Sequence, residues 1–244
     1  MAIAILGDIH SNLAALKVVL EKVDELAIKR ILFVGDLVGY NASPAESIYL
    51  FQQRYFVGIS GNHDRYVTGQ EMRDVRETTI EAIEYTRKAI GTTGVDFLRQ
   101  LPDTRMVDQR YLIVHGSVLD RDEYMLSAEI ITKNMHQLRT NYTGIEICFF
   151  GHSHFPAVIG SGRADTRFPV TRTVKLNPLK QYMINPGSVG QPRDAVPLAS
   201  FAVYDPEAAS VTIVRLQYDT TDSHDRVIKA GLGRALAERL LVGK

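Results

Sequence analysis

Five short segments of the 244-residue chain share one pattern, in which an apolar run is followed by Asp, Asn or His next to glycine. The apolar runs are typical of buried strands. The polar clusters that follow them are Gly7-Asp8-Ile9-His10, Gly35-Asp36, Gly61-Asn62-His63-Asp64, His115-Gly116 and Gly151-His152-Ser153-His154. One strand that ends in a carboxylate is ordinary, whereas five strands with the same chemistry predict a shared site.

The first sixty residues alternate between strand and helix patterns. Strands are predicted at 2–6, 30–34 and 55–59, with helices between them. Such alternation is typical of parallel strands joined by right-handed crossovers. Because sites in open α/β sheets form beyond the carboxyl ends of the strands, we expect the polar clusters to converge.

The rest of the chain consists of two parts that differ in composition and pattern. Residues 65–103 are rich in charge and are predicted to form a helical insert that lies over the site. Further strands are predicted at 111–114, 146–150, 157–159, 171–174, 181–184, 200–204 and 211–215, and further helices at 128–138, 223–230 and 234–241. We therefore expect a single α/β (α+β) domain over residues 1–244 with one insert.

Composition excludes several classes of protein. Hydrophobic residues make up 45% and charged residues 23% of the chain, which is typical of a soluble globular protein. The formal net charge of +0 offers no general attraction for nucleic acid or for anionic membranes. The N-terminus has no signal-peptide pattern, and Cys148, the single cysteine, fits a reducing compartment. We expect a cytoplasmic protein with no membrane partner, in which Cys148 is a core residue.

The clusters contain the side chains that bind transition metals. Five of the seven histidines lie in them, and with Asp8, Asp36 and Asn62 they make eight candidate groups. Converging carboxylates would repel each other unless cations were present. Imidazole with carboxylate and amide oxygen, and no thiolate, suits Mn, Fe, Ni or Zn. Eight such groups are too many for one tetrahedral ion and suit two ions about 3.5–4 Å apart, which would activate a water molecule and neutralise a phosphate.

In order and spacing, these motifs resemble those of the calcineurin-like metallophosphoesterase superfamily. The resemblance covers the chain from residue 3 to about residue 215 and rests on Asp8-x-His10, Gly35-Asp36-x-x-Gly39, Gly61-Asn62-His63-Asp64, His115 and Gly151-His152-x-His154. It implies a four-layer α-β-β-α sandwich, with two mixed β-sheets flanked by helices.

The resemblance also implies roles for individual residues. Asp8, His10 and His154 would hold the first metal ion. Asn62, His115 and His152 would hold the second, and Asp36 would bridge the two. His63 would act on the leaving-group oxygen, as a general acid or through a hydrogen bond, and Asp64 would orient it.

A late loop over residues 185–194 resembles the bacterial and archaeal subgroup related to diadenosine tetraphosphate hydrolases and small phosphodiesterases. Ser188 and Arg193 are candidate phosphate contacts in this loop, although for Ser188 a plain turn between two strands of the second sheet fits slightly better. Asn12, Tyr40 and Arg65 are the other candidate substrate contacts, and Asn12 fits a helix cap at least as well.

At two positions the sequence departs from that of related phosphatases, and these differences narrow the range of candidate substrates. Protein serine/threonine phosphatases carry an arginine in the second motif and another before the third, and here those positions are Leu37-Val38 and Ile59-Ser60. A protein phosphatase is therefore unfavourable. With the subgroup resemblance, we predict a small, nucleotidic phosphodiester or dinucleoside polyphosphate, hydrolysed by in-line attack of a metal-bridging water. A non-catalytic scaffold with the same fold and a nuclease remain alternatives, although the intact motifs disfavour the first and the neutral charge disfavours the second. The sequence leaves open whether the chain forms a homodimer.

Overall fold

The computed structural model describes residues 1–72, 75–160 and 163–244. In this part of the chain there are twelve strands and seven helices. The strands are β1 (Ile3–Leu6), β2 (Arg30–Phe33), β3 (Phe56–Gly58), β4 (Arg105–Val107), β5 (Tyr111–Ile113), β6 (Ile147–Phe149), β7 (Ala157–Gly160), β8 (Arg163–Asp165), β9 (Arg172–Lys175), β10 (Tyr182–Asn185), β11 (Ala199–Asp205) and β12 (Ser210–Leu216). The helices are α1 (Leu13–Glu25), α2 (Pro44–Gln52), α3 (Asn62–Thr68), α4 (Glu77–Arg99), α5 (Ala128–Asn141), α6 (Thr220–Lys229) and α7 (Arg234–Val242).

The strands form two mixed sheets of six strands each. Sheet A has the order β3-β2-β1-β11-β12-β9, and sheet B has the order β4-β5-β6-β10-β7-β8. In sheet A, β1, β2 and β3 run parallel, as predicted, and the later strands are antiparallel. In sheet B, β5, β6 and β10 run parallel and the outer strands are antiparallel. The carboxyl ends of these parallel strands carry the polar loops.

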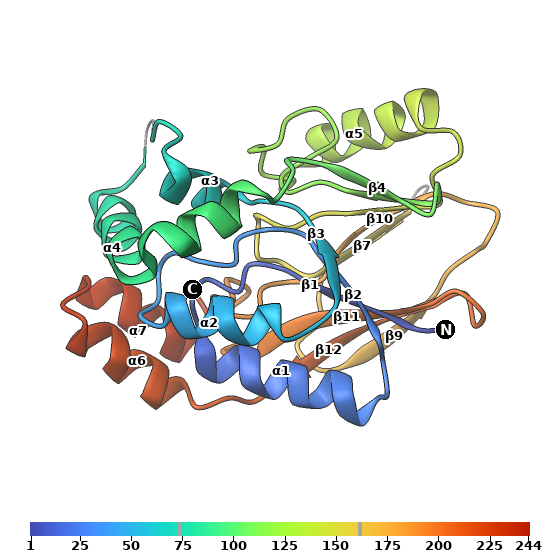
Figure 1. Cartoon of the computed structure of the whole chain (residues 1–244). Helices are drawn as coiled ribbons and strands as arrows, with labels where there is room; N and C mark the ends of the chain where they lie inside the picture. The colour runs from blue at the N-terminus through green and yellow to red at the C-terminus, as the bar shows by residue number, and fades with distance from the viewer. Residues whose placement is uncertain (73–74, 161–162) are drawn as a thin grey trace.

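Successive side chains along a strand point to opposite faces of its sheet, so each sheet packs against a different layer on each face. In β1, Ile5 packs between the sheets in the same core as Ile113 and Phe149, whereas its neighbours Ala4 and Leu6 face α1. A third core lies between sheet B and α5. Figure 1 shows α1 and α5 on opposite sides of the two sheets. The predicted four-layer α-β-β-α sandwich is therefore confirmed.

The helical insert begins earlier than its composition indicated. Helix α3 starts at Asn62, inside the third motif, and ends at Gly69 with a left-handed φ of 113°. Helix α4 spans most of the insert and is interrupted at Gly91, where φ is 60° and ψ is −167°. The helix is therefore kinked at this glycine.

The last two helices form a hairpin that packs beside α4 (Figure 1). Their apolar face joins Val227, Leu236 and Leu240 to Ala82 of α4 and to Tyr40 of the second motif loop. The end of the chain is thereby held next to the polar loops. None of the helices in the described residues has the length and apolar composition of a bilayer-spanning segment.

Three features differ from the sequence-based expectation. Strands β4 and β8 were not predicted, because each is only three residues long, too short for a strand pattern to stand out. The late loop at 185–194 is not a turn within one sheet. It connects β10 of sheet B to β11 of sheet A, so it passes over the edge where both sheets end.

Candidate metal centre

The polar clusters meet where parallel strands of both sheets end. Asp8, Asp36 and Asn62 follow β1, β2 and β3 of sheet A. His115 and His152 follow β5 and β6 of sheet B. The convergence expected from the strand-end pattern is therefore observed.

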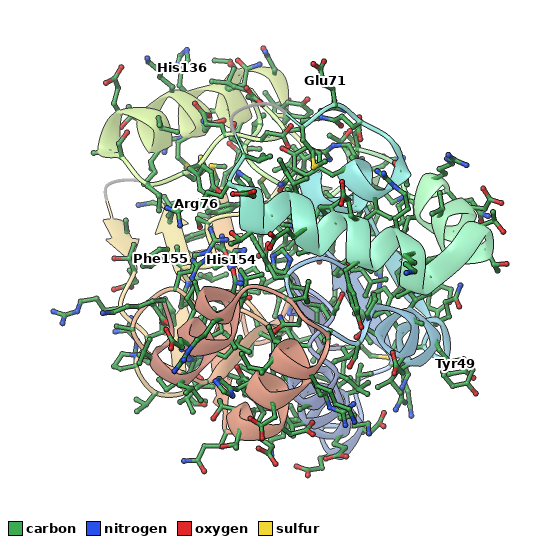
Figure 2. The ribbon with its side chains drawn as sticks, turned by 90° about the vertical axis from the view of Figure 1, so that its left-hand side faces the viewer. Tyr49, Glu71, Arg76, His136, His154 and Phe155 are labelled. Carbon is green, nitrogen blue, oxygen red and sulfur yellow. The ribbon has the colours of Figure 1, made fainter. Side chains whose placement is uncertain are left out.

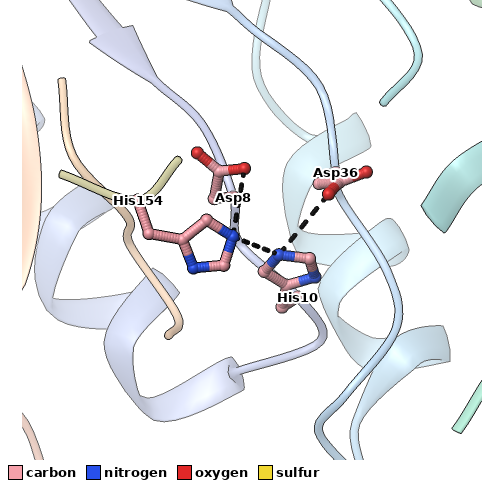
Figure 3. Close-up of side chains that lie close together, drawn as sticks. All are labelled: Asp8, His10, Asp36 and His154. Atoms are coloured by element: carbon pink, nitrogen blue, oxygen red, sulfur yellow. Dashed lines mark hydrogen bonds and ion pairs between the residues drawn. The ribbon is translucent and has the colours of Figure 1, made fainter. Parts of the chain in front are cut away.

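The first group of candidate ligands consists of Asp8, His10, Asp36 and His154, whose ligand atoms all lie within 4.8 Å of one another. The Nε2 atoms of His10 and His154 are 3.1 Å apart (Figure 3). His10 Nε2 is 3.5 Å from an oxygen of Asp36, and His154 Nε2 is 3.5 Å from an oxygen of Asp8. All four side chains are buried. Nitrogen and carboxylate oxygen brought together in this way form a donor set for a first-row metal ion.

The second group consists of Asp36, His115 and His152, with ligand atoms again within 4.8 Å of one another. His115 Nε2 is 3.3 Å from Asp36 Oδ2. The Asn62 side-chain oxygen lies 3.0 Å from His115 Nε2 and 3.0 Å from His152 Nδ1. Because Asp36 belongs to both groups, the geometry offers two adjacent positions that share one carboxylate.

Backbone carbonyls orient three of the imidazoles. The Nδ1 atoms of His10, His115 and His154 lie 3.1, 2.8 and 2.5 Å from a carbonyl oxygen. A ring that donates its Nδ1–H to a carbonyl keeps the Nε2 lone pair free, and this contact fixes both tautomer and ring direction. These three Nε2 atoms all point into the ligand groups.

The loops that carry the ligands adopt an unusual backbone conformation. Positive φ angles occur at five candidate ligands, with values of 51° at Asp8, 48° at His10, 59° at Asp36, 65° at His152 and 63° at His154. Left-handed non-glycine residues store strain and concentrate at functional sites. Close approach also requires glycine, since a Cβ at Gly61 would lie 2.0 Å from an Asp36 oxygen, and one at Gly39 would lie 2.3 Å from His63 Nδ1.

Burial and the charges of neighbouring groups strongly shift the pKa values of the candidate ligands. Burial raises the pKa of Asp8 to about 7, although the charge of His115 opposes it. Burial alone would raise the pKa of Asp36, but the neighbouring imidazoles outweigh it and hold that pKa well below its usual range. Burial alone would lower the pKa of His115, but Asp36 raises it to about 9. Burial holds the pKa values of His10 and His154 well below the usual range. Without a cation, the carboxylates therefore depend on a protonated imidazole.

Unpartnered atoms show that the donor set fits metal ions. Within the described residues, Asp8 Oδ2 and His152 Nε2 are buried and have no hydrogen-bond partner. A buried polar atom without a partner costs about 1–3 kcal/mol. A cation in each ligand group would provide the positive charge and the missing partners at once. The residues present thus match a metal centre built from nitrogen and oxygen donors.

His63 lies on the cavity side of this centre. Its ring is 4.7 Å from the His10 ring and 4.2 Å from the Tyr40 ring, centroid to centroid. Burial lowers the pKa of His63 to about 4. Its Nδ1 atom is buried beside Gly39 without a partner among the described residues. Nε2 is therefore the ring nitrogen that can reach a ligand in the cavity.

Asp64 does not pair with the His63 ring, contrary to the role implied by the resemblance. Its carboxylate accepts hydrogen bonds from the backbone N–H groups of Asp36 and Gly61, both at 2.9 Å, and from those of Leu37 and Val38 at 3.0 and 3.2 Å. Asp64 occupies the third position of α3, from which its side chain reaches back to the helix start. Its structural role is to hold the Asp36 loop against α3.

A cavity of about 410 Å³ opens beside the candidate ligands Asn62 and His152 and beside His63. Two of the predicted substrate contacts, Tyr40 and Arg193, line it. The wall also contains Tyr66, Val75, Arg76, Thr78 and Thr79, which belong to the helical insert.

Several lining residues were not singled out from the sequence. Tyr124 stacks on the ring of the ligand candidate His152 at 3.9 Å, and Arg76 and Arg239 also face the cavity. Arg239 is carried by α7, whose position depends on long-range packing, so no local pattern marks it.

The structure gives two of the other predicted substrate contacts internal roles. The side-chain oxygen of Asn12 caps α1, and its amide donates to the Gly190 carbonyl at 2.9 Å. The Ser188 hydroxyl is fully buried and donates to the Asp8 carbonyl at 2.8 Å. Neither group is free for a ligand, so we expect no substrate contact from them. Ser188 instead ties the late loop to the Asp8 loop.

Arg65 is also engaged within the protein. Its guanidinium group pairs with Asp122 and donates to the Ser60 carbonyl at 3.1 Å and to Gln70 at 3.0 Å. Arg65 therefore positions the loop that carries Asp122 and Tyr124, and we expect no direct substrate contact from it.

The two remaining histidines lie away from the centre. His136 is exposed on α5 (Figure 2). His224, on α6, contacts Asp225 at the surface. Both lie outside the two ligand groups.

Comparison with known proteins identifies the family. A model of the calcineurin-like phosphoesterase superfamily domain matches residues 1–209. An uncharacterized protein of Methanocaldococcus jannaschii, MJ0912, is 33% identical in a match of length 246 that covers 99% of this chain and 98% of that one. A metallophosphoesterase from Sphaerobacter thermophilus has 31% identity and a TM-score of 0.86 over 100% of this chain and 99% of its own. A hypothetical protein from Pyrococcus horikoshii OT3, PH1004, shares the fold at 21% identity and a TM-score of 0.82, over 100% and 98% of the two chains.

The fold and the site define a metal-dependent hydrolase of phosphate esters. The chain belongs to the calcineurin-like phosphoesterase superfamily.

Proposed function

We propose that the protein binds two first-row transition-metal ions and hydrolyses the phosphodiester or phosphoanhydride bond of a small, nucleotidic substrate. The observation that carries the proposal is the pair of buried ligand groups that share Asp36. Asp8, His10 and His154 would hold one ion together with Asp36, and Asn62, His115 and His152 would hold the other. When bound, the ions supply Lewis acidity that neutralises the phosphate and lowers the pKa of a water molecule toward about 7.

The protein's own groups act on the rest of the substrate. Because His63 Nδ1 has no acceptor nearby, the neutral ring is best protonated on Nε2, which faces the cavity. Nε2–H would donate to the leaving-group oxygen as charge develops there. Arg193 would pair with a phosphate oxygen, and its Nη2 already lies 3.4 Å from the Tyr40 hydroxyl. Tyr40, between Arg193 and His63, would hold both at the scissile group.

The test is hydrolysis by the Mn-loaded protein of phosphomonoesters, nitrophenyl phosphodiesters, cyclic nucleotides and dinucleoside polyphosphates. We expect diesters or dinucleoside polyphosphates to be the best substrates. His63→Ala should lower kcat by about 100-fold or more while metal binding is kept. His136→Ala is the matched control, since this exposed histidine should leave kcat unchanged. No turnover of any substrate class, or wild-type kcat in His63→Ala, would contradict the proposal.

A further inference from the structure

We propose that the cavity takes a nucleotide with a second phosphate beyond the scissile one, and that Arg239 on α7 is a main contact for it. This inference rests on the proposed function, because it takes the scissile phosphate to lie at the metal centre. It assigns a substrate-binding role to the C-terminal helical hairpin.

The charge of the cavity wall favours a dianionic ligand. Arg76, Arg193 and Arg239 come from three separate segments and line the same space of about 410 Å³. Among the described lining residues the one carboxylate is Asp122, which already pairs with Arg65. A single phosphate at the metal centre would leave part of this positive charge unpaired.

Arg193 is linked to the metal centre through Tyr40. Arg193 packs over Tyr40, with its guanidinium carbon 5.9 Å from the ring centroid, and Tyr40 in turn lies 4.7 Å from the His10 ring. Arg193 is thus within reach of the scissile phosphate. Arg239 lines the same cavity from α7, a helix whose apolar face packs with Tyr40.

The guanidinium group of Arg239 is held at one nitrogen and keeps its outer donors free. Its Nε donates to the backbone oxygen of Lys244 at 2.6 Å, and in the described part of the chain its Nη groups make no hydrogen bond. Burial first, and then the charge of Arg193, lower the pKa of Arg239. An anion between Arg193 and Arg239 would relieve the repulsion between the two guanidinium groups. It could also accept two parallel N–H hydrogen bonds from the planar guanidinium group of Arg239.

A second feature of the wall also favours an anion. Thr78 and Thr79, in the first turn of α4, line the cavity together with Arg76, the residue before the helix. Backbone N–H groups at a helix start carry partial positive charge and add to the attraction for phosphate. Tyr66 and Tyr124 supply flat apolar surface in the same wall, which suits a nucleobase.

The position of Arg239 in the chain indicates a role in specificity. The superfamily model matches residues 1–209, whereas α6 and α7 lie beyond this range. The helical hairpin α6–α7 therefore adds the positive charge of Arg239 to a cavity whose metal ligands all lie within residues 1–209.

A matched pair of substrates tests the inference. Thymidine 5′-(4-nitrophenyl phosphate) and its 3′-phosphorylated form contain the same scissile ester and differ by one phosphate. We expect the Mn-loaded wild-type protein to have a KM about 10-fold or more lower for the 3′-phosphorylated form. Arg239→Met should reduce this ratio to about 2, and Arg239→Lys, which keeps the charge but loses the fork, should give an intermediate value.

Arg234→Met is the control on the same helix. Its side chain is 83% exposed and pairs with Glu238, so the KM ratio should stay at the wild-type value. Equal KM values in the wild-type protein, or an unchanged ratio in Arg239→Met, would overturn the inference.

Calorimetry separates this inference from the proposed function. Thymidine 3′,5′-bisphosphate should bind about 10-fold more tightly than thymidine 5′-monophosphate, and Arg239→Met should abolish the difference. If neither nitrophenyl ester were hydrolysed, the proposed function would be wrong. The difference in affinity between the bisphosphate and the monophosphate would still decide whether Arg239 binds a second phosphate. Equal affinities would overturn that role even in an active enzyme.

Discussion

Substitution of Asp64 by asparagine separates a structural role from a catalytic one. The carboxylate accepts four backbone N–H groups, from Asp36, Leu37, Val38 and Gly61, and is fully buried. An amide of the same shape keeps one oxygen and presents an NH₂ group where the other stood. One or two N–H groups then lose their acceptor, and the remaining bonds lose the help of the charge. At about 1–3 kcal/mol for each such loss, the free energy of unfolding should fall by about 2–5 kcal/mol.

The assay is equilibrium unfolding in urea, followed by circular dichroism, together with metal binding and turnover. Asp96→Asn is the control, because Asp96 is 65% exposed and pairs only with Arg99, so we expect a change of less than about 0.5 kcal/mol. If Asp64→Asn kept wild-type stability yet lost as much turnover as His63→Ala, the reasoning would be wrong. Asp64 would then act through the His63 imidazole, as the motif resemblance implied.

Three further predictions test the supports of the site. Gly61→Ala should lower turnover by about 100-fold, because its Cβ would lie 2.0 Å from the carboxylate shared by the two ligand groups. Gly144→Ala, where a Cβ meets only one backbone oxygen at 3.9 Å, should retain activity, and similar losses in both variants would contradict this prediction. Arg215→Met should lower the free energy of unfolding by about 3–5 kcal/mol in urea titrations, since it strands the Asp194 carboxylate that Arg215 holds at 2.9 Å; wild-type stability would refute this. Burial raises the pKa of the Cys148 thiol, so dithionitrobenzoate should label it only after unfolding, and rapid labelling of the native protein would show that this core is open.

Much of the site could be predicted because its signals are local. An apolar strand followed by Asp8, Asp36 or His115 places a polar side chain at a carboxyl edge, and parallel strands bring such edges together. The sharing of Asp36 between two groups followed from the number of donors and from the motif resemblance. The fold class needed no more than the alternation of strands and helices with that resemblance.

The contacts that could not be predicted from the sequence are set by turns of the backbone and by packing between distant segments. Asp64 follows His63 directly, which suggested a pair, but the helix that starts at Asn62 turns the Asp64 side chain back toward its own first turn. For Ser188 a turn within the second sheet was the better prediction, yet its loop crosses from one sheet to the other and Ser188 itself is fully buried. Arg239 reaches the cavity only because a hairpin far along the chain packs on Tyr40. Contacts of this kind arise from tertiary packing.

The most direct test of the two-metal centre is anomalous diffraction from crystals of the Mn-loaded protein. We predict two manganese peaks about 3.5–4 Å apart, with Asp36 between them, one next to His10 and His154 and the other next to His115 and His152. A single peak, or peaks away from Asp36, would contradict the account.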